Sequence, residues 1–292
     1  MAAVAAVTAW GGGNVLIAAV PMNGLAIAFH RLWLGTLVYV LALRVTGRWP
    51  TLRALRLGWQ GGVAFGLNIA TFFVAIHLTS VASATTISAL QPIAVLGFAA
   101  AVFGERIRPR HVAATVVAVG GVAMVTFGAT GVGRSDRVGD LVAVLALLAW
   151  SAYFVTSKRA RAHLDTLEYM TVLNLVAFFV VAPVALLTGS LTASDGHLTG
   201  TTFLAVLCIV LVPGSGHVLM NWAHAHVTLV LASLVTLAMP VISAAAAAAF
   251  IDQPVTGVQV VGIVVVLAAL AFVITGDARD GRMAPAETEP AG

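Results

Sequence analysis

Several polar side chains that could bind a solute lie inside long apolar stretches of the sequence. His217, Asn221 and His224 are spaced i, i+4 and i+7, so they share one face of a helix. They follow the run Pro213 to Gly216, which predicts a break in that helix. A broken helix exposes backbone groups that can bind a solute, so this stripe predicts a binding site. Hydrogen bonding between helices would explain the same stripe as well.

Arg31 is a charged residue inside an apolar run long enough to cross a bilayer. A charge near the centre of such a helix costs about 2.5–3.5 kcal/mol on insertion scales. Its guanidinium could hold a solute carboxylate through a bidentate contact. The structural interpretation, which the sequence favours, is that Arg31 reaches the membrane surface or pairs with Asp140.

Other candidates are polar or aromatic side chains at similar depths of separate apolar runs. Ser88 and Gln91 precede Pro92, which removes a backbone donor and predicts a bent, polar wall. Aromatic faces could stack on a substrate, although packing or interfacial anchoring is their commoner role. The predicted substrate-binding residues are Trp10, Asn14, Arg31, Asn68, Ser88, Gln91, Trp150, Tyr153, His217 and Asn221.

The elements that must position these residues are transmembrane helices. Of 292 residues, 60% are hydrophobic and 9% charged, against about 25% charged in an average soluble domain. The composition therefore predicts an all-α integral membrane protein. Its apolar spans are expected near 2–20, 25–43, 57–76, 79–103, 111–127, 139–157, 166–187, 201–223, 228–250 and 258–275.

The basic residues predict the orientation, because cytoplasmic loops carry the excess of Lys and Arg. With the N-terminus inside, 12 of the 15 basic residues face the cytoplasm, and only Arg134 and Arg137 lie outside. Ten spans return the C-terminus to the cytoplasm, where 276–292 is expected to be a disordered tail. The positive charge indicates the lipid bilayer as a partner rather than nucleic acid. The lone Cys208 excludes a disulfide within the chain and Cys-based metal sites.

The two halves of the chain resemble each other. An offset of 148 residues aligns Ser88 with Thr236 and Pro92 with Pro240, and an offset of 140 aligns Trp10 with Trp150. Each half, 1–127 and 139–275, then holds five spans. An odd number of spans inverts the second copy, so the sequence predicts two inverted five-helix repeats. Chance alignment of Ala-rich helices is the alternative.

Several short motifs lie in a fixed order along the two halves of the chain. In the first half they are Ala9-Trp10-Gly11, His30-Arg31-Leu32, Leu90-Gln91-Pro92, Gly104-Glu105-Arg106-Ile107 and Val119-Gly120-Gly121-Val122. The second half has Ala149-Trp150-Ser151, Ala232-Ser233, Met239-Pro240 and Gly262. Over nearly the whole chain this pattern resembles the EamA-type family of the drug/metabolite transporter superfamily. The resemblance implies a carrier that exports amino acids or similar small metabolites across a bacterial inner membrane.

One motif departs from the family pattern. The Gly104-Glu105-Arg106 element corresponds in the second half to Asp252-Gln253-Pro254, which lacks the pair of an acidic and a basic residue. This difference puts in doubt any mechanism that uses the motif symmetrically. Glu105 itself is expected to pair with Arg106 or with a helix end.

Other functions are weighed against metabolite export by alternating access. Efflux of drugs or cations would favour an acidic group deep in the spans, and none is present there. Ser215, His217 and Asn221 suggest, remotely, an intramembrane serine protease, but Ser215 and His217 are two residues apart, and such residues on a helix point about 200° apart. The sequence is also compatible with a passive channel, and with a homodimer. The sequence has no HExxH motif or Gly-rich phosphate loop, and no metal or cofactor is expected.

Overall fold

A computed structural model describes residues 1–79, 81–128, 136–250 and 255–279, and within these ranges the chain is helical without strands. The first half contains α1 (Ala2–Ala19), α2 (Gly24–Val45), α3 (Leu52–Leu78), α4 (Val81–Ser88), α5 (Gln91–Phe103) and α6 (Pro109–Phe127). The second half contains α7 (Arg137–Arg161), α8 (Thr166–Leu187), α9 (Gly200–His224), α10 (Leu229–Val235), the 3-10 helix η1 (Thr236–Ala238), α11 (Met239–Phe250) and α12 (Gly257–Arg279).

The predicted membrane architecture is confirmed. Nine stretches of the described chain are long and apolar enough to cross a bilayer, with α4–α5 and α10–α11 each contributing one. The remaining apolar helix, α1, has 18 residues and packs against α9 and α11. At 1.5 Å per residue it is about 27 Å long, close to the thickness of the hydrocarbon core.

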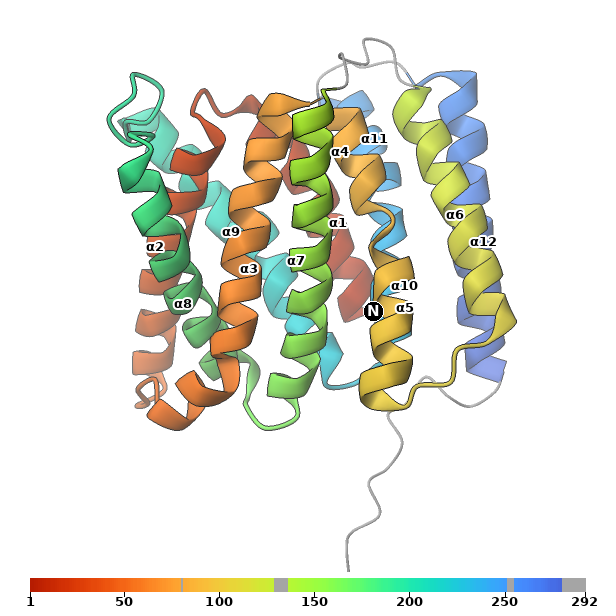
Figure 1. Cartoon of the computed structure of the whole chain (residues 1–292), viewed down its shortest axis with the longest axis horizontal. Helices are drawn as coiled ribbons and strands as arrows, with labels where there is room; N and C mark the ends of the chain where they lie inside the picture. Colours follow the sequence, from red (N-terminus) through yellow and green to blue (C-terminus); the bar gives the residue numbers. More distant parts are fainter. Residues whose placement is uncertain (80, 129–135, 251–254, 280–292) are drawn as a thin grey trace, which may run out of the picture.

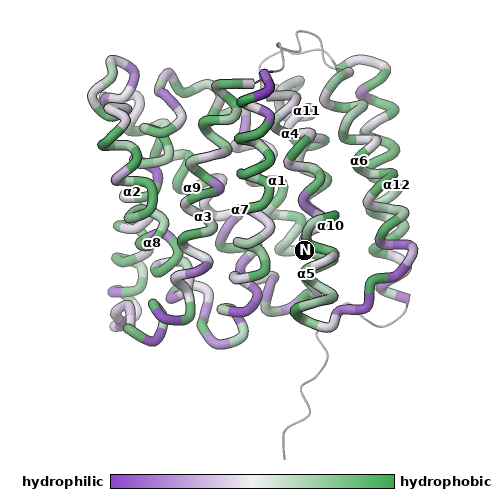
Figure 2. The backbone as a smooth tube through the Cα atoms, viewed as in Figure 1, coloured by the Kyte–Doolittle hydropathy of each residue, from purple (hydrophilic) through white to green (hydrophobic). Residues whose placement is uncertain are grey.

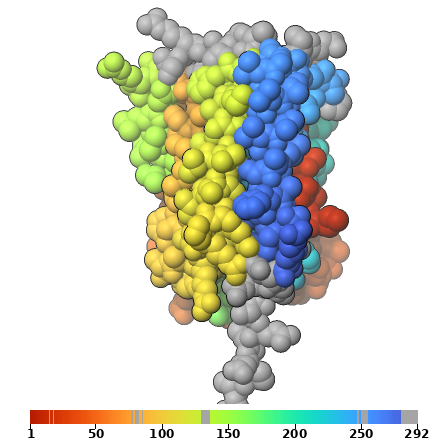
Figure 3. Space-filling view, turned by 90° about the vertical axis from the view of Figure 1, so that its right-hand side faces the viewer, coloured from red at the N-terminus to blue at the C-terminus, as the bar shows by residue number. Residues whose placement is uncertain are grey.

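The helices stand side by side across the membrane plane. In Figure 1 they run from α2 and α8 at the left, through α3, α9, α7 and α1, to the α4–α5 and α10–α11 pairs. Helices α6 and α12 form the right-hand end, which Figure 3 shows as one continuous face. Figure 2 shows hydrophilic residues gathered at the lower edge of the bundle and hydrophobic ones along the helices. That distribution is the one expected of a helix bundle in a bilayer.

The boundaries of the helices reproduce the internal repeat. The starts of α3, α4, α5 and α6 each match the start of α9, α10, α11 and α12 at the same offset of 148 residues. Packing also pairs the halves, because α3 packs on α7, α1 on α9, α2 on α8 and α6 on α12. The first helix of each half thus contacts the third helix of the other half. These reciprocal contacts agree with two inverted five-helix repeats.

Small residues bring helices of the two halves together. In the sequence, Gly58, Gly62 and Gly66 are spaced four residues apart, which predicts a close-packing face rather than a binding site. In the structure this face of α3 lies against α8. A Cβ atom on Gly62 would lie 2.5 Å from the Cβ of Val176, which is closer than real side-chain contacts. The prediction that this stripe serves packing rather than binding is confirmed.

The predicted break in the eighth span is wrong, since α9 runs without interruption from Gly200 to His224 with Pro213 inside it. A proline removes one backbone donor, but neighbouring helices can satisfy the polar groups around it. Here Trp10 Nε1 donates a hydrogen bond to the Pro213 carbonyl at 3.1 Å. The breaks fall between α4 and α5, as predicted from Pro92, and at η1 before Pro240.

The last helix extends beyond its predicted end. Helix α12 continues to Arg279, so residues 276–279 are helical rather than part of a disordered tail. The sequence places Asp277 outside the spans, but its carboxylate is buried and contacts Arg110 and, at 3.2 Å, Nε2 of His111. These contacts join α6 to α12 at their ends. Residues 280–292 of the expected tail lie outside the described residues.

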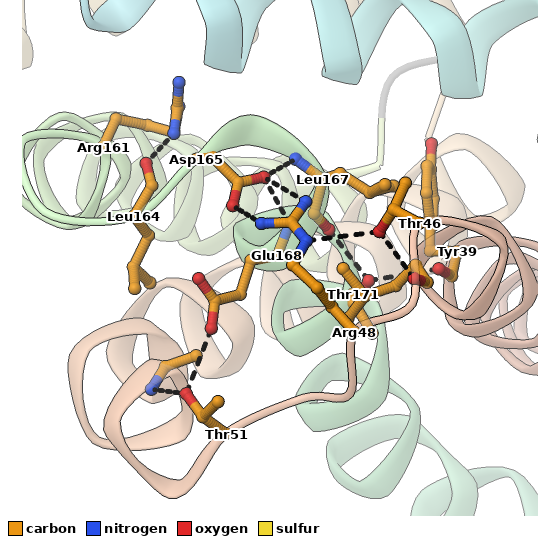
Figure 4. Close-up of polar contacts among 12 residues, drawn as sticks. Tyr39, Thr46, Arg48, Thr51, Arg161, Leu164, Asp165, Leu167, Glu168 and Thr171 are labelled. Carbon is orange, nitrogen blue, oxygen red and sulfur yellow. Dashed lines mark hydrogen bonds and ion pairs between the residues drawn. The ribbon is translucent and has the colours of Figure 1, made fainter.

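Polar contacts also fix the connection between α2 and α3 (Figure 4). Arg48 binds both carboxylate oxygens of Asp165, at 2.5 and 3.4 Å, and Thr51 donates to Glu168 at 3.0 Å. Partial burial acts to raise the pKa of Asp165, but the Arg48 guanidinium and the backbone N–H groups of Leu167 and Glu168 outweigh it and lower that pKa. The first half is thereby joined to the start of α8.

Candidate functional site

Aromatic side chains from both halves meet at the centre of the bundle. The rings of Trp10 on α1 and Trp150 on α7 lie edge to face at 6.1 Å. His217 of α9 lies 4.8 Å from the Trp10 ring and 4.8 Å from Phe65 of α3. The repeated Trp pair therefore comes together with the polar stripe of α9. The sequence predicts both features, whereas their contact is a result of the fold.

A chain of hydrogen bonds holds the polar stripe in place. Asn221 Nδ2 donates to the Tyr153 hydroxyl at 2.7 Å and to the His217 carbonyl at 2.8 Å. The Tyr153 hydroxyl lies 3.4 Å from His217 Nδ1. Because this hydroxyl accepts from Asn221, its own proton is available to His217 Nδ1. When that proton is directed at Nδ1, a neutral His217 carries its own proton on Nε2.

The third member of the stripe has a different position. His224 packs against the ring of Phe154, with ring centroids 4.9 Å apart, and is buried near the end of α9. Both of its ring nitrogens lack a hydrogen-bond partner among the described residues. His217 and Asn221 therefore join the candidate site, while His224 lies a turn away from it.

Arg31 borders a cavity of about 230 Å³ next to the aromatic cluster. Its side chain is 6% exposed, so the prediction that it reaches the membrane surface is wrong. The predicted pair with Asp140 is also wrong, because Asp140 accepts a hydrogen bond from Thr79 at 2.8 Å and no ion pair joins it to Arg31. The guanidinium instead lies 5.8 Å from the centroid of the Phe65 ring.

Residues that the sequence does not single out complete this cavity. With Arg31 and His217, its walls include Tyr39, Phe65, Met170 and Asn174. Tyr39 lies eight residues after Arg31, so helical spacing puts the two about 80° apart on one broad side of α2, which is the one usable signal in the sequence. The Tyr39 hydroxyl donates to the Gly214 carbonyl at 3.4 Å. The other residues are ordinary components of apolar helices, and only the fold brings them together.

The remaining predicted site residues lie elsewhere. Asn14 donates to Ser243 at 3.3 Å, and Asn68 donates to the Ala146 carbonyl at 3.0 Å, so each joins two helices. Gln91 lies at the start of α5, where its Oε1 is 3.3 Å from the hydroxyl of Thr236 in η1. The two helix breaks therefore meet.

Unused polar atoms remain at the break in the first half. Gln91 Nε2 and Ser88 Oγ are buried, and neither has a hydrogen-bond partner among the described residues. A solute that entered between the two breaks could bind both atoms. They are separate from the cavity at Arg31, whose walls come from α2, α3, α8 and α9.

The arrangement needed for a serine protease is not found around Ser215. This residue is exposed on the outer side of α9, and its hydroxyl donates to the Val212 carbonyl at 2.7 Å. His217 instead contacts Tyr153, Trp10 and Phe65. A His base therefore does not face the Ser215 hydroxyl. Among the described residues, no group of three His, Cys, Asp or Glu side chains could hold a metal ion.

A second polar contact joins the halves near the end of α5. Glu105 accepts hydrogen bonds from the backbone N–H groups of Leu229 and Val230, at 2.8 and 3.1 Å, where α10 begins. Lys158 Nζ lies 3.5 Å from the same carboxylate and donates to the Val227 carbonyl at 2.7 Å. The prediction that Glu105 binds a helix end is confirmed.

Comparison with known proteins agrees with this architecture. The sequence model of the EamA-like transporter family matches residues 1–127 and 137–275. A solved structure, described only as a crystal structure of a protein, has a TM-score of 0.76 and 21% sequence identity over 95% of this chain and 96% of that chain. At this identity the likeness concerns the fold. A search of curated proteins returned no match.

Proposed function

Because this chain belongs to the EamA-like transporter family, we propose that it exports small polar metabolites such as amino acids by alternating access. The family consists of membrane transporters, and the substrate class is the new part of the proposal. The observation that carries it is the junction of Trp10, Trp150, Tyr153, His217 and Asn221, which brings aromatic faces and polar groups from both halves together. A site between inverted repeats is where transporters of this kind bind their solute.

The charge of the site favours a polar metabolite over a cationic drug. Arg31 and His217 border the cavity, and no Asp or Glu of the described ranges contributes to its walls. A cation would be repelled by Arg31 and would find no carboxylate there. Efflux of drugs or cations is therefore the second candidate, and uptake of a cationic dye by vesicles would favour it.

The experiment is counterflow in proteoliposomes. Vesicles containing the purified protein are loaded with one unlabelled amino acid, sugar or cationic dye, and uptake of the labelled compound is followed. Saturable counterflow of amino acids supports the proposal, whereas unsaturable flux indicates a passive channel. His217→Ala should abolish counterflow, because it removes the ring shared by Trp10, Phe65 and Tyr153.

Ser215→Ala is the matched control on the same helix. Its hydroxyl bonds within α9 and faces away from the site, so this variant should keep the counterflow of the wild type. Loss of flux in Ser215→Ala with normal flux in His217→Ala would overturn the proposed site. A covalent serine adduct with a fluorophosphonate probe would instead revive the protease hypothesis.

The proposed location is the cytoplasmic membrane of a bacterium, with both termini in the cytoplasm. The support is that the sequence places most basic residues in loops on one side of the membrane and predicts an even number of spans. In agreement, Figure 2 shows hydrophilic residues gathered at the lower edge of the bundle. Fusions of a fluorescent protein and of alkaline phosphatase to the C-terminus test it. We expect the fluorescent-protein fusion to fluoresce and the alkaline phosphatase fusion to be inactive. An active phosphatase would place the C-terminus outside the cytoplasm and contradict the proposed orientation.

A further inference from the structure

Arg31 is a buried cation for which the described residues provide no counter-ion. No described residue forms an ion pair with its guanidinium or accepts a hydrogen bond from it, and its side chain is 6% exposed. Its neighbours are the ring of Phe65 and the hydroxyl-bearing side chains of Tyr39 and Tyr153. A charge removed from water is costly unless it is paired and hydrogen-bonded. The fold alone therefore leaves the charge of Arg31 uncompensated.

The cavity beside Arg31 is narrow. The free space there is about 230 Å³ in all, and this volume includes the open side of the cavity. We expect so narrow a space to take one charged group rather than a whole metabolite. The rest of the metabolite would lie toward His217, which borders the cavity and also contacts the ring of Trp10.

The hydrogen-bonding groups on the cavity wall are suited to an anion. Arg31 offers a planar fork of N–H donors, and His217 with Nδ1 occupied by Tyr153 carries a donor at Nε2. The amide of Asn174 donates to the Met170 carbonyl at 2.9 Å and the Tyr39 hydroxyl donates to Gly214. The Arg31 guanidinium and His217 Nε2 thus remain as donors for an anion, and the guanidinium carries a positive charge.

We propose that the Arg31 cavity is an anion subsite that binds the carboxylate of the transported solute. This inference rests on the proposed function and narrows it to solutes that carry a carboxylate. A carboxylate can accept two parallel N–H bonds from the guanidinium, and it supplies the missing negative charge. An inorganic anion such as chloride has the same charge but cannot make the bidentate contact.

The first test compares leucine with leucinamide in proteoliposomes. The amide has the same side chain and amino group but no carboxylate, so a preference that depends on Arg31 reports on binding of the carboxylate. Wild-type counterflow should favour leucine by at least roughly tenfold, because an unpaired buried polar group penalises the analogue. Arg31→Gln should remove that preference, and Arg31→Lys should keep part of it because it keeps the charge without the fork. Equal transport of both compounds by the wild type would overturn the proposal.

Arg44→Gln is the control, because Arg44 lies at the exposed end of the same helix and stacks on Trp49, 4.2 Å from the ring centroid. It should keep the preference of the wild type. A preference that survives in Arg31→Gln would contradict the assignment of the carboxylate to Arg31. Size-exclusion profiles identify variants that fail to fold. If Arg31→Gln fails to fold, the preference of Arg31→Lys is compared with that of the wild type instead.

A second test separates failure of this inference from failure of the proposed function. Thermal unfolding of the purified protein in detergent is measured in acetate, in acetamide and in chloride at equal concentration and ionic strength. Acetate alone should raise Tm, and Arg31→Gln should abolish the rise even if no solute is transported. Equal rises of Tm in acetate and in chloride would indicate a site for inorganic anions. An unchanged Tm in acetate would exclude an anion site at Arg31. Either result contradicts the carboxylate proposal.

Discussion

Replacing Glu105 by alanine is expected to destabilise the contact between the two halves. Its carboxylate accepts hydrogen bonds from the N–H groups of Leu229 and Val230 at the start of α10, and it lies 3.5 Å from Lys158 Nζ. The first N–H groups of a helix have no partner within it, and a negative charge there is favoured by the helix dipole. Removal of the carboxylate leaves both N–H groups and one ammonium group without their partner.

The loss can be estimated from the two charge-assisted hydrogen bonds. Bonds of this kind contribute about 1.5–3 kcal/mol each to the free energy of unfolding. The Glu105 side chain is 12% exposed, so water can replace part of each bond in the variant. We therefore expect Glu105→Ala to lower the free energy of unfolding by about 2–3 kcal/mol. With an entropy of unfolding of about 2.1 cal/mol/K per residue, the corresponding fall in Tm for 292 residues is about 3–5 °C.

Tryptophan fluorescence during heating in detergent measures this change, since the chain has 6 tryptophans. Glu105→Gln should lose roughly half as much, because its amide keeps one acceptor oxygen without the charge. The control is Glu168→Ala, which removes a carboxylate from the first turn of α8 that accepts one hydrogen bond from Thr51. This control should lose less than about 1 kcal/mol. A Glu105→Ala protein whose Tm equals that of the control would refute the reasoning.

Three further substitutions test the fold and the site through Tm. Asp165→Asn should flatten the dependence of Tm on pH below about pH 5, because a lowered pKa gives stability that is present above about pH 4 and is lost as the pH falls through the folded-state value. An unchanged slope would show that the Arg48 contact does not matter. Gly62→Ala should cost about 1–3 kcal/mol through overpacking, whereas Gly97→Ala, with no neighbour within 4 Å, should be neutral; equal Tm values contradict the packing face. Tyr153→Phe should cost about 1–2 kcal/mol and slow counterflow, since it removes the hydroxyl bonded to Asn221, and a wild-type Tm and rate would exclude that role.

The fold could be predicted from the sequence because its main determinants are local or repeated. Apolar length gives the spans, and the offset found from Pro92 and Pro240 reproduces the starts of four pairs of helices. The end of α12 could not be predicted in this way. Asp277 resembles a tail residue in sequence, and its helix continues because Arg110 and His111 of α6 compensate its charge.

The candidate site was less predictable, because polar side chains in a span can be recognised but their partners cannot. Asn68 and His217 are both polar residues inside an apolar span. In the structure, Asn68 binds the Ala146 carbonyl, whereas His217 borders the cavity. The expected break at Pro213 failed for the same reason. Whether a proline interrupts a helix depends on the neighbour that satisfies the surrounding groups, which in this protein is Trp10.

The cavity arises where the two repeats differ. Trp10 and Trp150 are common to both halves and meet near the centre, whereas Arg31 has no charged equivalent in α8, which contains no charged residue after Glu168. At the offset of 148, His217 and Asn221 correspond to the apolar Ile69 and Phe73 of α3. Under the proposed alternating access, the repeated residues would form the symmetric frame that moves between two conformations. The residues that break the symmetry supply one cationic end and one aromatic, hydrogen-bonding end, and such a polarity is what a solute with a carboxylate at one end requires.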